Sequence, residues 1–161
     1  MAKGQAERLL PMMEQMMLEA GIDWPDITRI HVGTGPGNFT GIRIAVALAR
    51  GLALGLGISA VGVTGFQARA LGVTASNFWV TIPAPRDQIY VQQFGQAAFT
   101  IDRSDFDSAG APVFDLMDLA PDALVLAIAG VGGDRTTRPA PFYLRAADAL
   151  PSSDPPPVIL P

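Results

Sequence analysis

The first apolar pattern in the chain, over residues 5–20, has the period of an α-helix. At 100° per residue, seven apolar side chains fall within an arc of roughly 160°. These residues are Leu9, Leu10, Met12, Met13, Met16, Met17 and Ala20. Gly21 supplies a stop signal, and Pro11 is expected either to bend the helix or to mark its true start. The arc is wider than one packed neighbour requires, and methionine suits contact surfaces that adapt.

A strand, a glycine-rich turn, a second helix and another strand follow. The pattern predicts a strand over Thr28–Val32, a turn over Gly33–Gly41, a helix over 40–56 and a buried strand over Ser59–Val63. This order predicts a parallel pair of strands joined by a crossover. The helix is apolar all round apart from two arginines, so both of its faces need cover. Small residues recur along it at every fourth position, at Gly41, Ala45, Ala49 and Ala53.

The rest of the chain is richer in aspartate, and its elements are shorter. The predicted elements are a short helix over 64–72, strands over Phe78–Ile82 and Ile89–Phe94, a helical turn over Leu116–Leu119, a buried strand over Ala123–Ala129 and an extended tail over 151–157. Together the two parts indicate an α/β protein.

Composition narrows the possible functions. Lys and Arg number 11 against 15 Asp and Glu, and the net charge of −4 disfavours a protein that grips nucleic acid alone. Cysteine is absent and His31 is the single histidine, so zinc fingers, thiol nucleophiles and Ser–His triads have no support.

The N-terminus lacks the apolar core of a signal peptide. The apolar stretch Ile44–Val63 divides into a helix and a strand, each shorter than the ~20 residues of a membrane span. These features indicate a soluble, cytoplasmic protein.

The glycine-rich turn is the first candidate for chemistry, because a helix N-terminus after a strand can hold an anion. It is neither a Walker loop nor a dinucleotide fingerprint, and no acidic residue lies between Ile27 and Arg86 to hold a magnesium ion. A tight turn with Asn38 or Thr40 capping the helix is favoured over direct phosphate binding.

The other candidates favour structural roles. His31 lies in an apolar strand and is expected to be a satisfied core or edge histidine. The spacing of Asp102, Asp105 and Asp107 fails the EF-hand pattern and indicates a solvated loop. Arg86 and Asp87 are expected to cap a hairpin. We therefore predict no catalytic residue and no metal ligand in this chain.

Two interpretations of the first two helices remain open on physical grounds. The wide methionine-rich arc is either ordinary core or, together with the all-apolar second helix, an interface between chains.

Several motifs resemble the TsaB (YeaZ) family, in the family's order and over nearly the whole chain. The specific run is Gly35-Pro36-Gly37-Asn38-Phe39-Thr40-Gly41-Ile42-Arg43, and the other matching segments are 5–11, 50–53, 61–64, 86–94 and 142–149. The resemblance implies an actin-like, Hsp70-like (ASKHA) fold. It also implies a non-catalytic subunit of the bacterial machinery that makes threonylcarbamoyladenosine at adenosine 37 of tRNA. Glycoprotease-type names attached to such proteins conflict with the residues present.

The resemblance further implies the partners and the interface. The partners would be the catalytic subunit TsaD, the TsaE ATPase and, in a homodimer, a second copy. The chain would reach tRNA only through the complex, with no membrane contact. ATP or ADP and metal are expected on the partner subunits, with no cofactor in this chain. The expected interface residues are Leu9, Met13, Met16, Met17, Ala45, Leu48 and Leu52, and the helix-start loop comprises Gly35, Gly37, Asn38 and Thr40. The alternative function is an ASKHA-type ATPase that uses the Gly33–Gly41 loop.

The resemblance also predicts the domain organisation. We expect a partial N-terminal lobe over 1–64, a smaller C-terminal α/β lobe over 65–150 and a Pro-rich tail over 151–161. The family begins with strands that precede the first helix, so the N-terminal lobe is expected to lack its first strands, through a miscalled start or a fragment. That loss would leave the edge of the 28–32 strand open and an apolar sheet face uncovered.

Overall fold

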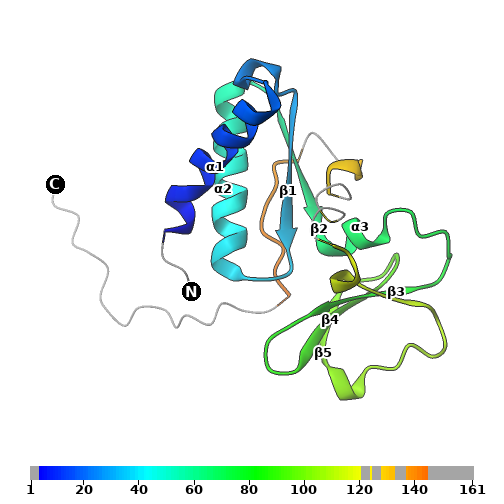
Figure 1. The fold of residues 1–161 in the computed structure, drawn as a ribbon. Coiled ribbons are helices and arrows are strands. Elements are labelled where there is room, and N and C mark those ends of the chain that lie inside the picture. The colour runs from blue at the N-terminus through cyan, green and yellow to red at the C-terminus, as the bar shows by residue number, and fades with distance from the viewer. Residues whose placement is uncertain (1–3, 121–123, 125–127, 133–136, 145–161) are drawn as a thin grey trace, which may run out of the picture.

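The computed structural model describes residues 4–120, 124, 128–132 and 137–144. Its framework is a parallel pair of strands with the long helix α2 against it and α1 on α2, followed by a four-stranded sheet (Figure 1). The helices are α1 (Gln5–Ala20), α2 (Phe39–Leu56) and α3 (Gly65–Ala70), with short 3-10 turns η1 (Trp24–Asp26), η2 (Arg103–Asp105) and η3 (Leu116–Asp118). The strands are β1 (Arg29–Gly35), β2 (Ser59–Thr64), β3 (Trp79–Pro83), β4 (Gln88–Gln93), β5 (Phe99–Asp102) and β6 (Val113–Asp115).

Helix α1 has the bounds that its apolar period predicts. It ends where Gly21 adopts a φ of 67°, and the Gly21 N–H donates to the carbonyl of Leu18. Pro11 lies inside the helix, so the prediction that it marks the helix start is wrong. Pro11 is the seventh residue of the helix, so its missing N–H leaves the carbonyl of Glu7 without that intrahelical bond, and the helix nevertheless continues to Ala20. Helix α1 lies along α2 (Figure 1).

Helix α2 packs one stripe of side chains against β1 and β2. Ile42, Val46, Ala49 and Ala53 are buried, and three of them form a core cluster with Val32 of β1. Among the described helices, α2 has the length and apolar composition to cross a membrane, and 22% of that window is buried inside the protein. The continuous apolar stretch in the sequence begins at Ile44, whereas the helix begins at Phe39 and has 18 residues. Its buried stripe packs on a sheet, as in an α/β core.

The opposite face of the parallel pair is also covered, contrary to the expectation of an uncovered apolar face. Val61 and Val63 of β2 are almost completely buried there, with Ala68 of α3. Leu124, Ile128 and Val131 pack against them. Leu124 and residues 128–130 are helical, so the strand predicted over Ala123–Ala129 is wrong for these residues, while 123 and 125–127 lie outside the described part. An apolar run of this length does not separate strand from helix by period alone.

The second sheet has the strand order β5-β4-β3-β6. Strands β3 and β4 form the predicted antiparallel pair, and β6 runs parallel to β3. The core beneath this sheet is aromatic: Phe66, Phe78 and Tyr90 are buried together with Val80 and Ile82. Strands β5 and β6 were not predicted, because four and three residues are too few to show an alternating pattern.

Residues 137–144 return from the second half of the chain to the first, running beside α2 (Figure 1). The Phe142 N–H donates to the carbonyl of Thr34 at 2.8 Å, at the end of β1. The Tyr143 ring stacks on Phe39 at 4.4 Å between centroids, and Arg43 Nε donates to Tyr143 Oη. Helix α2 therefore lies between α1 and this segment.

Candidate docking surface and helix-start loop

The residues predicted for the partner interface lie on α1 and on the flank of α2 that faces it. Met16 is exposed, with 61% of its surface accessible. The other six are half-buried: Leu9, Met13, Met17, Ala45, Leu48 and Leu52. Ala45 also packs against the core cluster around Val32. The structure thus brings the seven side chains to one pair of helices, with Met16 pointing outward from it.

Further apolar side chains of α1 are exposed and were not in the predicted set. Leu18 is 75% exposed, and Met12 is exposed as well. No described side chain of α1 is fully buried. The sequence could have indicated Met12, because this residue belongs to the wide apolar arc. Leu18 lies outside that arc, so the helical period gave no signal for it. We refer to the exposed apolar residues of α1, together with the adjoining outer face of α2, as the α1–α2 surface.

The outer face of α2 carries small residues, but not those singled out from the sequence. Ala49 and Ala53 face the sheet and are buried. Ala47, Gly51 and Gly55 are exposed instead, and a Cβ added at either glycine would meet no atom within 4 Å. A groove of about 750 Å³ separates the first turns of α1 from α2, with Leu9, Met12 and Ile44 among its lining residues. The α1–α2 surface is therefore open and includes a groove between the two helices.

The helix-start loop is held by the protein's own atoms. Gly35 has a φ of 103°, and a Cβ built there would lie 2.7 Å from Ile42 Cδ1 and 3.0 Å from the Phe142 carbonyl oxygen. Asn38 caps α2, since its Oδ1 accepts the Gly41 N–H at 2.8 Å. Gly37 and Thr40 are exposed beside them. The turn-and-cap interpretation is confirmed with Asn38, and not Thr40, as the cap.

Substituting the cap should destabilise the protein measurably. Asn38→Ala removes the acceptor for the Gly41 N–H, and we expect the free energy of unfolding to fall by about 1 kcal/mol in urea titrations. Asn38→Asp keeps the acceptor and adds a negative charge at the helix N-terminus, so it should match or exceed the wild type. Equal losses for the two variants would contradict the capping role.

The remaining candidates have structural positions. His31 Nδ1 lies 3.0 Å from the carbonyl oxygen of Ile128, which confirms the expectation of a satisfied histidine. Arg86 and Asp87 both have positive φ in the β3–β4 turn, as expected for a hairpin end. Asp102 ends β5 and accepts a hydrogen bond from Gln88 of β4, while Asp105 and Asp107 accept hydrogen bonds from residues next to them in the chain. In the described part of the chain, no group of three or more His, Cys, Asp or Glu residues is placed to hold a metal ion.

Comparisons with known proteins agree on one family. Residues 1–121 match the family model described as "TsaD: tRNA N6-adenosine threonylcarbamoyltransferase". The chain is 38% identical over 71 residues to the tRNA threonylcarbamoyladenosine biosynthesis protein TsaB of Escherichia coli, covering 44% of this chain and 31% of that protein. It is 30% identical over 104 residues to TsaB of Haemophilus influenzae, covering 62% of this chain and 43% of that protein. The chain belongs to this family, in its TsaB (YeaZ) branch.

The fold of this TsaB-family chain is similar to that of YeaZ from Pseudomonas aeruginosa. The TM-score is 0.62 at 23% identity, with 89% of this chain and 86% of that structure covered. The actin-like ASKHA fold expected from the resemblance is confirmed. The chain spans less than half the length of the two TsaB proteins that it matches.

Proposed function

We propose that this TsaB-family chain is a non-catalytic subunit in tRNA threonylcarbamoyladenosine biosynthesis, and that it docks on the catalytic subunit TsaD through the α1–α2 surface. The observation that carries the proposal is the exposure of apolar side chains on α1, in a chain whose relatives are named for that pathway. The proposed location is the cytoplasm.

The physical argument begins with the apolar side chains of α1. Met12 and Met16 are exposed large hydrophobic residues one turn apart on the same side of the helix, and Leu18, which is also exposed, lies outside the arc that they share. Burying apolar surface stabilises association by roughly 25 cal/mol per Å², so a cluster of this kind favours a partner that covers it. Methionine side chains also adjust to the shape of a partner surface.

The outer face of α2 adds a geometric argument. Gly51 and Gly55 lie one turn apart in open space, with Ala47 one turn earlier. Without side chains between them, two helices approach each other closely and gain dispersion contacts along their backbones. A helix from a partner therefore fits against α2 better than a flat sheet does.

The same surface has the properties required for a homodimer, so a second copy competes with TsaD for it in this proposal. TsaE is proposed to join the complex through TsaD or at another surface, and tRNA to reach the chain only through the complex. ATP or ADP and metal are placed on the partner subunits. The ATPase alternative has no supporting observation in the helix-start loop, because Asn38 and Phe142 occupy the positions next to its glycines.

Co-purification with TsaD tests the proposal directly. The tagged chain, mixed with TsaD from the same bacterium, should elute with it as a stoichiometric complex in size-exclusion chromatography. Reconstituted threonylcarbamoylation of tRNA should depend on the chain. If TsaD elutes alone and its modification activity does not respond to the chain, the proposal is wrong. A shift to twice the mass without TsaD would identify the homodimer.

A further inference from the structure

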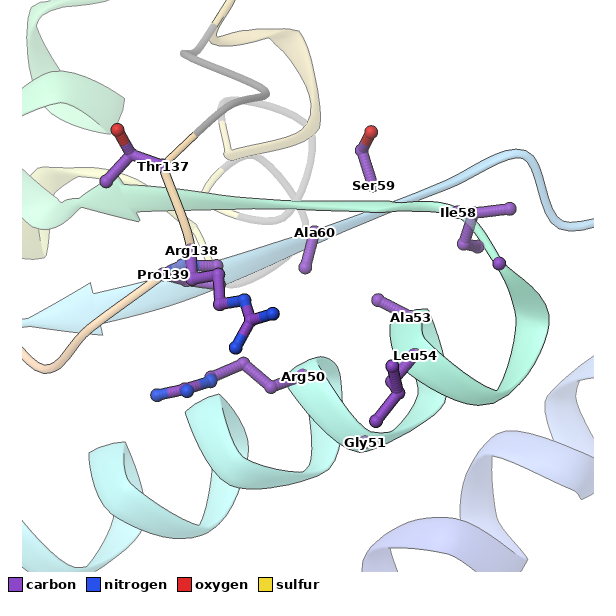
Figure 2. A pocket seen from close by; sticks show the side chains of 11 residues that line it. Arg50, Gly51, Ala53, Leu54, Ile58, Ser59, Ala60, Thr137, Arg138 and Pro139 are labelled. Atoms are coloured by element: carbon purple, nitrogen blue, oxygen red, sulfur yellow. The ribbon is translucent and has the colours of Figure 1, made fainter.

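A hollow of about 480 Å³ lies on the flank of α2 that faces away from α1. Figure 2 shows it between the C-terminal half of α2, the start of β2 and residues 137–139. The hollow adjoins the outer face of α2, with which it shares Gly51, and its lining includes part of the 50–53 segment that resembles the family.

Two arginines enter this hollow from different elements. Arg50 extends from α2 and Arg138 from the returning segment, and their guanidinium groups approach each other in Figure 2. None of the described residues that line the hollow is acidic. Within the described residues, the ion pair present joins Arg103 to Asp87, so neither guanidinium has a carboxylate partner there. Two positive charges held together repel each other, and an anion between them relieves that repulsion.

The backbone that carries Arg138 is fixed by its neighbours. Pro139 is buried, and its Cβ lies 3.1 Å from the place where a side chain at Gly62 would begin. A few residues further on, Phe142 is hydrogen-bonded to Thr34 and Tyr143 is stacked on Phe39. Packing of this segment therefore fixes the backbone of Arg138 beside α2, while the side chains of Arg50 and Arg138 are exposed. A fixed backbone lowers part of the entropy lost on binding a ligand.

The floor of the hollow is apolar. Ala53, Ile58 and Ala60 line it, while Ser59 and Thr137 turn away from it in Figure 2. A volume of about 480 Å³ lies within the range of small-molecule sites, roughly 300–1,000 Å³. The hollow thus combines paired guanidinium donors, which match phosphate geometry, with an apolar surface large enough for one ring.

We propose that this hollow binds a small phosphorylated molecule, with the phosphate between Arg50 and Arg138 and an apolar or aromatic part over Ala53 and Ile58. The proposal does not rest on docking to TsaD, because phosphate binding is measured on the chain alone.

Isothermal titration calorimetry of the full chain at constant ionic strength tests the site with inorganic phosphate, phenyl phosphate and benzyl alcohol. Phenyl phosphate should bind about tenfold more tightly than inorganic phosphate, because its ring adds apolar burial. Benzyl alcohol, which has the ring without the charge, should not bind measurably. Arg50→Gln and Arg138→Gln should each weaken phenyl phosphate binding by about tenfold or more. Arg8→Gln, which removes the same charge from α1, should leave it unchanged.

The contrary outcomes are equally distinct. The proposal is wrong if neither phosphate binds, if the two arginine variants bind phenyl phosphate as the wild type does, or if Arg8→Gln weakens binding equally. Tighter binding of a short oligothymidylate than of phenyl phosphate, through the same two arginines, would assign the hollow to a nucleic-acid backbone and overturn the small-molecule assignment. Circular dichroism and the unfolding midpoint of each variant separate loss of the site from loss of the fold.

Discussion

Gly35→Ala is expected to lower the free energy of unfolding by about 3 kcal/mol, the largest stability effect of any single change in the helix-start loop. Two costs add at this position. A φ of 103° strains any residue with a Cβ, and that Cβ would lie 2.7 Å from Ile42 Cδ1. The Phe142 carbonyl oxygen at 3.0 Å is backbone, and the N–H of the same residue donates to the Thr34 carbonyl, so this segment has little freedom to withdraw.

Two glycine variants separate these costs in the same urea titrations. Gly72 has a φ of 81° and open space around it, so Gly72→Ala reports backbone strain alone, about 1 kcal/mol. Gly51→Ala, in the helix with open space, should stabilise the protein by about 0.5–1 kcal/mol. If Gly35→Ala lowers the free energy of unfolding no more than Gly72→Ala does, Gly35 is not closely packed against Ile42 and Phe142, and the explanation is wrong.

Loss of TsaD binding is expected when Met16→Asp and Gly55→Arg are combined. An unpaired carboxylate in a dry interface costs several kcal/mol, so the dissociation constant should rise by about 100-fold or more. An arginine at position 55 would hold a partner helix away from α2. Neither change should damage the chain itself, because Met16 is 61% exposed and a Cβ at Gly55 meets nothing. Ala45→Arg is a poorer choice, since Ala45 packs against the core around Val32.

The matched control repeats both substitutions away from the α1–α2 surface. Met117→Asp changes a methionine that is 71% exposed in η3, and Gly132→Arg changes a glycine in open space. The control pair should retain TsaD binding in surface plasmon resonance within about twofold of the wild type. Equal losses for both pairs would mean that the contact is not made by α1 and α2, even if the chain does bind TsaD.

Local patterns in the sequence determined the long elements. The 3.6-residue period defined α1, the glycines at its end and after α2 defined the stops, and the strand–helix–strand order implied the parallel pairing of β1 and β2. Each of these signals acts within a few residues, so a single chain suffices to detect them. The motif run at Gly35–Arg43 carried the family for the same reason.

The sequence did not predict the short elements, because these are stabilised by pairing and packing with distant parts of the chain. Strand β5 exists through its pairing with β4, and β6 through its pairing with β3. The helical residues at Leu124 and 128–130 form an apolar layer against β2, and an apolar run of that length is equally compatible with a strand. The division into lobes at residue 64 remains our proposal.

By itself, the sequence determined the two long helices, the parallel pair, the tight glycine turn and the family. It also established that one of the first two helices has more apolar surface than a single neighbour covers. Only the tertiary structure decided which side chains remain exposed, because exposure depends on what packs against a residue and not on its spacing. In the structure, Ala49 and Ala53 face the sheet and are buried, whereas Gly51 and Gly55 are exposed. It also brought Arg50 and Arg138 to one hollow, since contacts between distant segments are set by how the chain returns on itself.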